Sequence, residues 1–102
     1  MGMVASPPTP LADRHVRITV TEVDRATVEE FAFQLAEHEP GTYCLVVDLA
    51  EVSFIDAQGI RALLTVAQRM WGAGGALALR NPAPIVRRLL EVVDLEHLLA
   101  PR

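Results

Sequence analysis

Hydrophobic and polar positions alternate over parts of the chain and run together over others. Residues 15–21, HVRITVT, alternate polar and apolar side chains, which predicts a strand with one buried face. Residues 43–49, YCLVVDL, are almost all apolar, which predicts a strand covered on both faces by helices. ALALR at 76–80 predicts a further strand.

Three segments between and after these strands show helical periodicity. Thr27 and Glu30 have capping-box spacing, so we expect a helix there that ends before Pro40. A second helix is expected over 57–71, stopped by the glycines at 72–75. A third is expected over 81–93, where the prolines fall in or before the first turn. The expected apolar stripes are Val28, Phe31, Ala32, Leu35 and Ala36 in the first helix, and Ile60, Leu63, Leu64, Ala67, Met70 and Trp71 in the second.

This order of elements predicts one α/β domain with parallel crossovers, covering residues 14–102. Prolines at 7, 8 and 10 indicate that residues 1–13 form an irregular tail. Phe33 lies off the stripe of its helix. It is either covered by a neighbouring segment, such as this tail, or part of an interface.

Length, charge and composition argue against several classes of protein. The 102 residues suit a single domain, and the net charge of −4 argues against nucleic acid as the main partner. No apolar run is long enough to span a membrane, and residues 1–13 lack the features of a signal peptide, so we expect a cytoplasmic protein. The single cysteine, Cys44, lies in an apolar run and is expected to be a buried small hydrophobe.

The sequence offers little for catalysis. A nucleophile needs a base beside it, but His15, His38 and His97 fall on different elements, and nothing in the sequence brings two of them together. No metal-ligand spacing occurs, and the glycines at 72–75 follow a helix, which is the wrong place for a phosphate-binding loop. We therefore expect a protein that is not an enzyme, with no catalytic residues, no metal site and no cofactor.

The segment VVDLAEVSFIDAQGI, residues 46–60, directs attention to a helix start. Asp56 stands where a side chain would cap the following helix. The next residue, Ala57, has no reactive atom. Asp56 and Gly59 either serve only the turn and its packing, or hold a surface for docking.

A resemblance to a known family adds to this reading. Residues 46–64, with Asp48-Leu49, Phe54-Ile55 and Asp56-x-x-Gly59, resemble the signature of the STAS domain, the fold of bacterial anti-sigma factor antagonists. TEVDRAT at 21–27 is similar to the segment before the family's first helix, with Asp24 at its acidic position, and 79–99 resembles its last strand and closing helix. The resemblance implies a STAS-type mixed β-sheet of about four strands with helices packed on it.

The resemblance also implies a role in transcription regulation. Family members bind an anti-sigma factor that is a serine kinase, and phosphorylation of the serine after the aspartate releases it. Here Ala57 stands at the serine position, Gln58 where Ser or Thr is usual, and Thr21 where Gly is common. The implied partner-binding residues, which would dock the kinase without a phosphorylation site, are Asp24, Asp56, Ala57, Gln58, Gly59 and Arg61.

Two other functions fit the same resemblance. The chain could be a STAS subunit or scaffold that docks the ATPase of a lipid transporter, or a domain that senses a small molecule. Sequence alone does not separate these partners, and it leaves the oligomeric state open.

Overall fold

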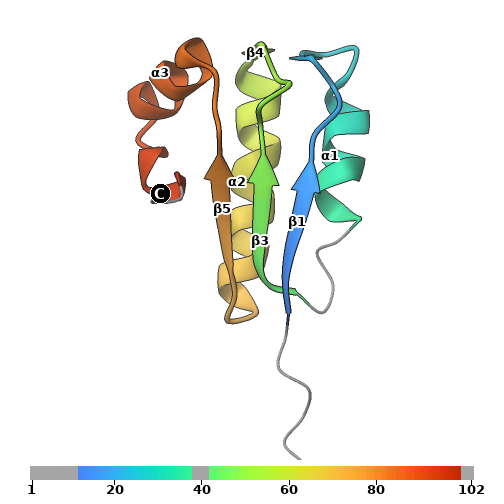
Figure 1. Ribbon diagram of the computed structural model, residues 1–102, viewed down its shortest axis with the longest axis vertical. Coiled ribbons are helices and arrows are strands. Elements are labelled where there is room, and N and C mark those ends of the chain that lie inside the picture. The colour runs from blue at the N-terminus through green and yellow to red at the C-terminus, as the bar shows by residue number, and fades with distance from the viewer. Residues whose placement is uncertain (1–11, 38–41, 100–102) are drawn as a thin grey trace, which may run out of the picture.

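The computed structural model describes residues 12–37 and 42–99, and the α/β architecture expected from the sequence is confirmed (Figure 1). The first strand begins before the expected domain start at residue 14, while residues 1–11 lie outside the described part. The elements are β1 (Ala12–Arg17), β2 (Glu22–Val23), α1 (Val28–Ala36), β3 (Thr42–Asp48), β4 (Phe54–Ile55), α2 (Ala57–Gly72), β5 (Ala76–Arg80), α3 (Pro84–Val92) and the short 3-10 helix η1 (Glu96–Leu98).

Three strands form the main sheet in the order β1-β3-β5, and all pair in parallel. The central residue Val47 pairs with Val16 on one side and Leu79 on the other. Because parallel neighbours need crossover connections, α1 and α2 both return along the sheet in the same direction, and Figure 1 shows both behind it. Among the described residues, no helix is both long and apolar enough to cross a membrane.

A second, two-stranded ladder lies beyond the carboxyl ends of β1 and β3. There β2 pairs in parallel with β4, Val23 opposite Ile55. Backbone hydrogen bonds continue the contact between the two ladders, with Ile18 N–H donating to the Asp48 carbonyl oxygen at 3.1 Å and Ser53 N–H to that of Thr21 at 2.7 Å. The ladder therefore supports the starts of α1 and α2.

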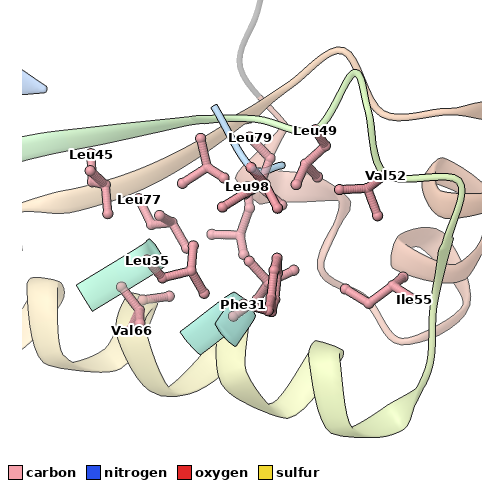
Figure 2. Packing of buried hydrophobic residues seen from close by; sticks show 14 of the residues in the cluster. Phe31, Leu35, Leu45, Leu49, Val52, Ile55, Val66, Leu77, Leu79 and Leu98 are labelled. Atoms are coloured by element: carbon pink, nitrogen blue, oxygen red, sulfur yellow. The ribbon is translucent and has the colours of Figure 1, made fainter. Parts of the chain in front are cut away.

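The hydrophobic core fills the space between the sheet and the two helices (Figure 2). The alternation expected in the first strand holds, since Val16 and Ile18 are buried while His15 and Arg17 are exposed. Completely buried large side chains come from every layer of this core: Ile18, Phe31, Leu35, Leu45, Leu49, Ile55, Leu63, Leu79 and Leu90.

The expectation that β3 is covered on both faces was wrong for the described residues. Leu45 and Val47 point to the helices and are buried, whereas Cys44 and Val46 on the other face are only half-buried. Burial raises the pKa of the Cys44 thiol, and the Asp13 carboxylate adds to the shift, so the thiol stays protonated at neutral pH.

The expected start of α1 at Thr27 is confirmed, but the capping box expected there was wrong. Thr27 is at the N-cap but makes no capping bond to the helix, and Glu30 accepts a hydrogen bond from Gln34 instead of completing a capping box. The Thr27 hydroxyl donates to the Glu22 carbonyl oxygen at 2.5 Å and accepts from Asp24 N–H at 3.0 Å. The Thr27 hydroxyl therefore bonds to the turn before the helix instead of to the helix itself.

In α2 the expected apolar stripe is mostly correct, with two differences. Val66 is buried, although it was not expected to be. Trp71 is 45% exposed and stacks on His97 of η1 with ring centroids 6.1 Å apart. The expected ends of the helices hold, with Gly74 in a left-handed conformation after α2 and Pro84 at the start of α3.

Two phenylalanines of α1 provide a test of this packing. Phe31 is fully buried and Phe33 is 60% exposed. Phe31→Ala should lower the free energy of unfolding by about 3–5 kcal/mol, because it leaves a cavity in the core. Phe33→Ala should change it by less than about 0.5 kcal/mol. Urea denaturation measures both, and equal losses would contradict the assigned orientation of α1.

Candidate functional site

The start of α2 is built by Asp56. This residue has extended backbone dihedrals, and its Oδ1 accepts hydrogen bonds from Gln58 N–H at 2.9 Å and Gly59 N–H at 3.1 Å. Two of the unpaired donors of the first turn are thereby satisfied. The expected cap is confirmed, and it fixes the direction in which the next side chains project.

Gly59 brings this first turn close to the β2–β4 ladder. The residue is buried, and a Cβ atom built on it would lie 2.6 Å from Val23 Cγ1 and would also collide with the side chain of Ile55. A side chain at this position would push the helix away from the ladder. The glycine of the sequence motif thus has a packing role.

Asp24 forms a similar helix start on the neighbouring strand. Because Val23 pairs with Ile55, Asp24 and Asp56 leave the parallel ladder at the same end, and Asp56 N–H donates to the Val23 carbonyl oxygen at 2.9 Å. Asp24 Oδ1 accepts from Ala26 N–H at 2.9 Å and from Thr27 N–H at 3.2 Å. Its carboxylate holds the turn before α1.

The remaining three residues of the expected site, Ala57, Gln58 and Arg61, are all exposed. We call these three residues and the 42% exposed Phe54, which stands two residues before Asp56, the entrance surface. Sequence reasoning did not assign Phe54 to it. The available signal was the alternation within β4, in which Ile55 is buried and Phe54 points outward.

No hydroxyl stands on the first turn of α2 at position 57. Ser53, in the preceding loop, is exposed, and its Oγ donates to the Thr21 carbonyl oxygen at 3.0 Å. The hydroxyl of Thr65 donates within the helix to the Arg61 carbonyl oxygen.

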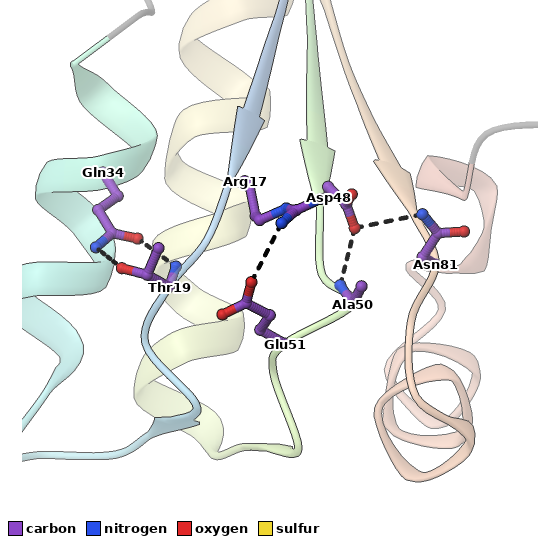
Figure 3. Close-up of polar contacts among 7 residues, drawn as sticks. All are labelled: Arg17, Thr19, Gln34, Asp48, Ala50, Glu51 and Asn81. Atoms are coloured by element: carbon purple, nitrogen blue, oxygen red, sulfur yellow. Dashed lines mark hydrogen bonds and ion pairs between the residues drawn. The ribbon is translucent and has the colours of Figure 1, made fainter.

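Polar groups at the carboxyl end of the main sheet hold the chain in place (Figure 3). Asp48 Oδ1 accepts from Ala50 N–H at 2.9 Å and Asn81 Nδ2 at 3.3 Å. Arg17 and Glu51 are 3.5 Å apart, and both are well exposed, so this pair adds little stability. Gln34 bonds Thr19 through both its amide oxygen and its amide nitrogen, which joins α1 to the chain after β1.

The described residues bring no catalytic group together. His15 lies at the sheet and His97 stacks on Trp71, while His38 is outside the described residues. Within residues 12–37 and 42–99, no three histidine, cysteine or acidic side chains are grouped as metal ligands. The feature with the clearest construction is therefore the entrance surface.

The packing of Gly59 gives a prediction with a matched control. Gly59→Ala should lower the free energy of unfolding by about 1–3 kcal/mol, because its Cβ collides with Ile55 and Val23. Gly72→Ala, whose added Cβ would meet no other part of the structure within 4 Å, should be neutral or stabilising by about 0.4–1 kcal/mol. Chemical denaturation of both variants decides the matter. A Gly59→Ala variant as stable as wild type would remove the packing role.

Known proteins share this architecture. The anti-sigma factor antagonist SpoIIAA in its unphosphorylated form matches with a TM-score of 0.72 and 19% identity, over 93% of this chain and 83% of that one. A sulfate transporter family protein from Wolinella succinogenes matches with a TM-score of 0.68 and 18% identity, over 92% and 76%. The STAS domain of a SulP transporter from Vibrio cholerae matches with a TM-score of 0.60 and 20% identity, over 93% and 72%.

At these identities the structural matches establish the fold alone. A comparison with curated protein sequences finds no match. The family model described as "Mlab, STAS domain" matches residues 9–100, which is most of the chain. The chain belongs to the STAS domain family.

Proposed function

We propose that this STAS domain is a non-catalytic cytoplasmic regulator that docks an anti-sigma factor of the serine-kinase type through the entrance surface. We further propose that it is not phosphorylated there, because Ala57 takes the place of the phosphoacceptor serine. The observation that carries the proposal is the exposed Ala57 on the first turn of a helix whose start is fixed by Asp56 and Gly59.

The chemistry of the entrance surface suits protein docking. Phe54 offers an exposed aromatic side chain, and Ala57 and Gln58 add no charge. Aromatic groups with uncharged neighbours are typical of interface centres, where burial of charge is costly. Arg61, one turn further along α2, adds a cation at the margin. Asp24 and Asp56 act beneath this surface by holding the two helix starts.

The same geometry argues for an antagonist without a switch. A phosphate on the first turn would bring about −1.5 to −2 charges to the docking surface. Ala57 cannot carry one, so the kinase has no means of releasing this partner at that position. Control would then come from protein level, from a competing partner or from a ligand.

A second function is favoured by a different observation. Two of the structural matches are a sulfate transporter family protein and a SulP transporter STAS domain. The chain would in that case be a STAS subunit or scaffold of a transport complex, such as one that docks the ATPase of a lipid transporter, and would bind through the same surface. A small-molecule sensor remains a third hypothesis, without a feature of the described residues that favours it.

The missing switch gives the decisive experiment. The lifetime of the complex with the candidate anti-sigma kinase is measured in ADP and in hydrolysable ATP. We expect equal lifetimes, and we expect Ala57→Ser to shorten the lifetime in ATP by becoming phosphorylated. Rapid loss of the wild-type complex in ATP, with phosphate on Ser53, would show that another hydroxyl serves as the switch. Absence of binding in both nucleotides would favour the transporter function.

A charge change tests the docking surface separately from the fold. Gln58→Glu adds a negative charge near the positive end of the α2 dipole, which should be neutral or stabilising by about 0.3–1 kcal/mol. It should nevertheless weaken partner binding, since the charge lies on the entrance surface. Gln68→Glu, exposed ten residues further along the same helix, is the control and should bind normally. Calorimetric titration measures the affinities, and thermal melting measures stability. Equal affinity of all three proteins would exclude Gln58 from the interface.

A further inference from the structure

A groove runs between α1 and α2 on the outer side of the helix layer, away from the sheet. Its volume is about 340 Å³. Small side chains from both helices line it, namely Ala32 and Ala36 of α1 and Ala62 of α2. Along α2 the lining includes Arg61, Thr65 and Arg69. The two alanines of α1 were expected to be core residues, but they are only half-buried and border this groove.

An exposed aromatic side chain stands beside the groove. Phe33 is 60% exposed and points away from the buried Phe31 and Leu35 of the same helix. In sequence it lies between Ala32 and Ala36, so it is level with the part of the groove that they line. An aromatic ring left in water beside an apolar groove suggests that the two are complementary parts of one interface.

Charges of opposite sign accompany the two features. Glu29 and Glu37 lie four residues before and after Phe33, so α1 presents an exposed acid–phenylalanine–acid stripe. On α2 the exposed Arg61 borders the groove. The acidic stripe of α1 is therefore opposite in charge to this border of the groove.

We propose that a second copy of this chain docks on the helix layer, with Phe33 of each copy seated in the α1–α2 groove of the other. A two-fold axis parallel to the helices carries α1 of one copy over α2 of its partner. Because α1 and α2 run in the same direction (Figure 1), the stripe of one copy lies along α2 of the other, with Glu29 facing the partner's Arg61. Phe33 and the groove lie on the same surface of the chain, so one two-fold rotation forms the contact between them twice.

The size of this surface sets the strength of the contact. Stable interfaces bury about 800 Å² per partner. The proposed contact involves two helices, one of them only nine residues long, so we expect it to bury less than that. We therefore expect a reversible dimer whose population rises with protein concentration. Ion pairs at its border would also make it weaker as salt increases.

Self-association does not depend on the identity of the partner proposed above, but the two surfaces overlap. Gln58 and Arg61 belong to the entrance surface and also line the groove. A dimer would thus cover part of the docking surface. This overlap supplies a control of partner binding through protein concentration in a chain that lacks a phosphorylation site at position 57.

Sedimentation velocity of the full chain over a wide range of concentrations tests the proposal. We expect the wild type to shift from monomer toward dimer, and Phe33→Glu to weaken the dimer about tenfold or more, as for the loss of a central interface residue. Phe54→Glu is the matched control, since Phe54 is exposed but lies outside the groove. The Phe54→Glu variant should dimerise normally even where it impairs partner binding. Each of the two proposals can therefore be overturned without the other. Circular dichroism confirms that each variant is folded.

Charge reversal identifies the orientation of the dimer. Arg61→Glu and Glu29→Arg should each weaken association, and the double variant should recover most of it, because the proposed pair is restored with reversed signs. A wild-type chain that stays monomeric at every concentration would overturn the proposal and leave the groove to a different protein. A dimer unaffected by Phe33→Glu, or double variants without recovery, would also overturn it.

Discussion

The close approach of the first turn of α2 to the β2–β4 ladder is the constraint on which the candidate site depends. Only a hydrogen atom fits at Gly59 between the helix and the side chains of Val23 and Ile55. With the helix held at this distance, Asp56 N–H reaches the Val23 carbonyl oxygen while the Asp56 carboxylate caps the turn above. Backbone and side chain thus fix the same residue from two directions, and the exposed side chains of the turn acquire a defined position.

The domain uses one construction twice. Each strand of the small ladder ends in a buried aliphatic residue followed by an aspartate, and each aspartate accepts backbone N–H groups at the beginning of a helical segment. Parallel pairing of the strands brings these two starts to one end of the molecule. Carboxylates that are committed to backbone donors are poor candidates for acid–base chemistry, which agrees with a binding function. Ala57 and Gln58 are left as the groups that a partner would meet first.

The two helices of the helix layer expose charges of opposite sign. Exposed positions of α1 are acidic around Phe33, whereas the groove border on α2 contains two arginines. The sheet face opposite the helices has small half-buried side chains such as Val46 and a protonated Cys44. The proposed partner surface and the proposed dimer contact meet at Gln58 and Arg61. Competition between them would connect the amount of protein to the amount available for docking.

The sequence by itself determined the features that depend on neighbours along the chain. It predicted the α/β class, the capped start at Asp56 and the ends of the helices, because capping, turn formation and helical period act over a few residues. Tertiary structure decided the rest. Whether β3 has one covered face, whether Thr27 bonds the helix or the turn before it, and whether Ala32 enters the core or borders a groove all depend on segments distant in sequence. Burial and surface complementarity arise only once the packing of the helices against the sheet and against one another is set.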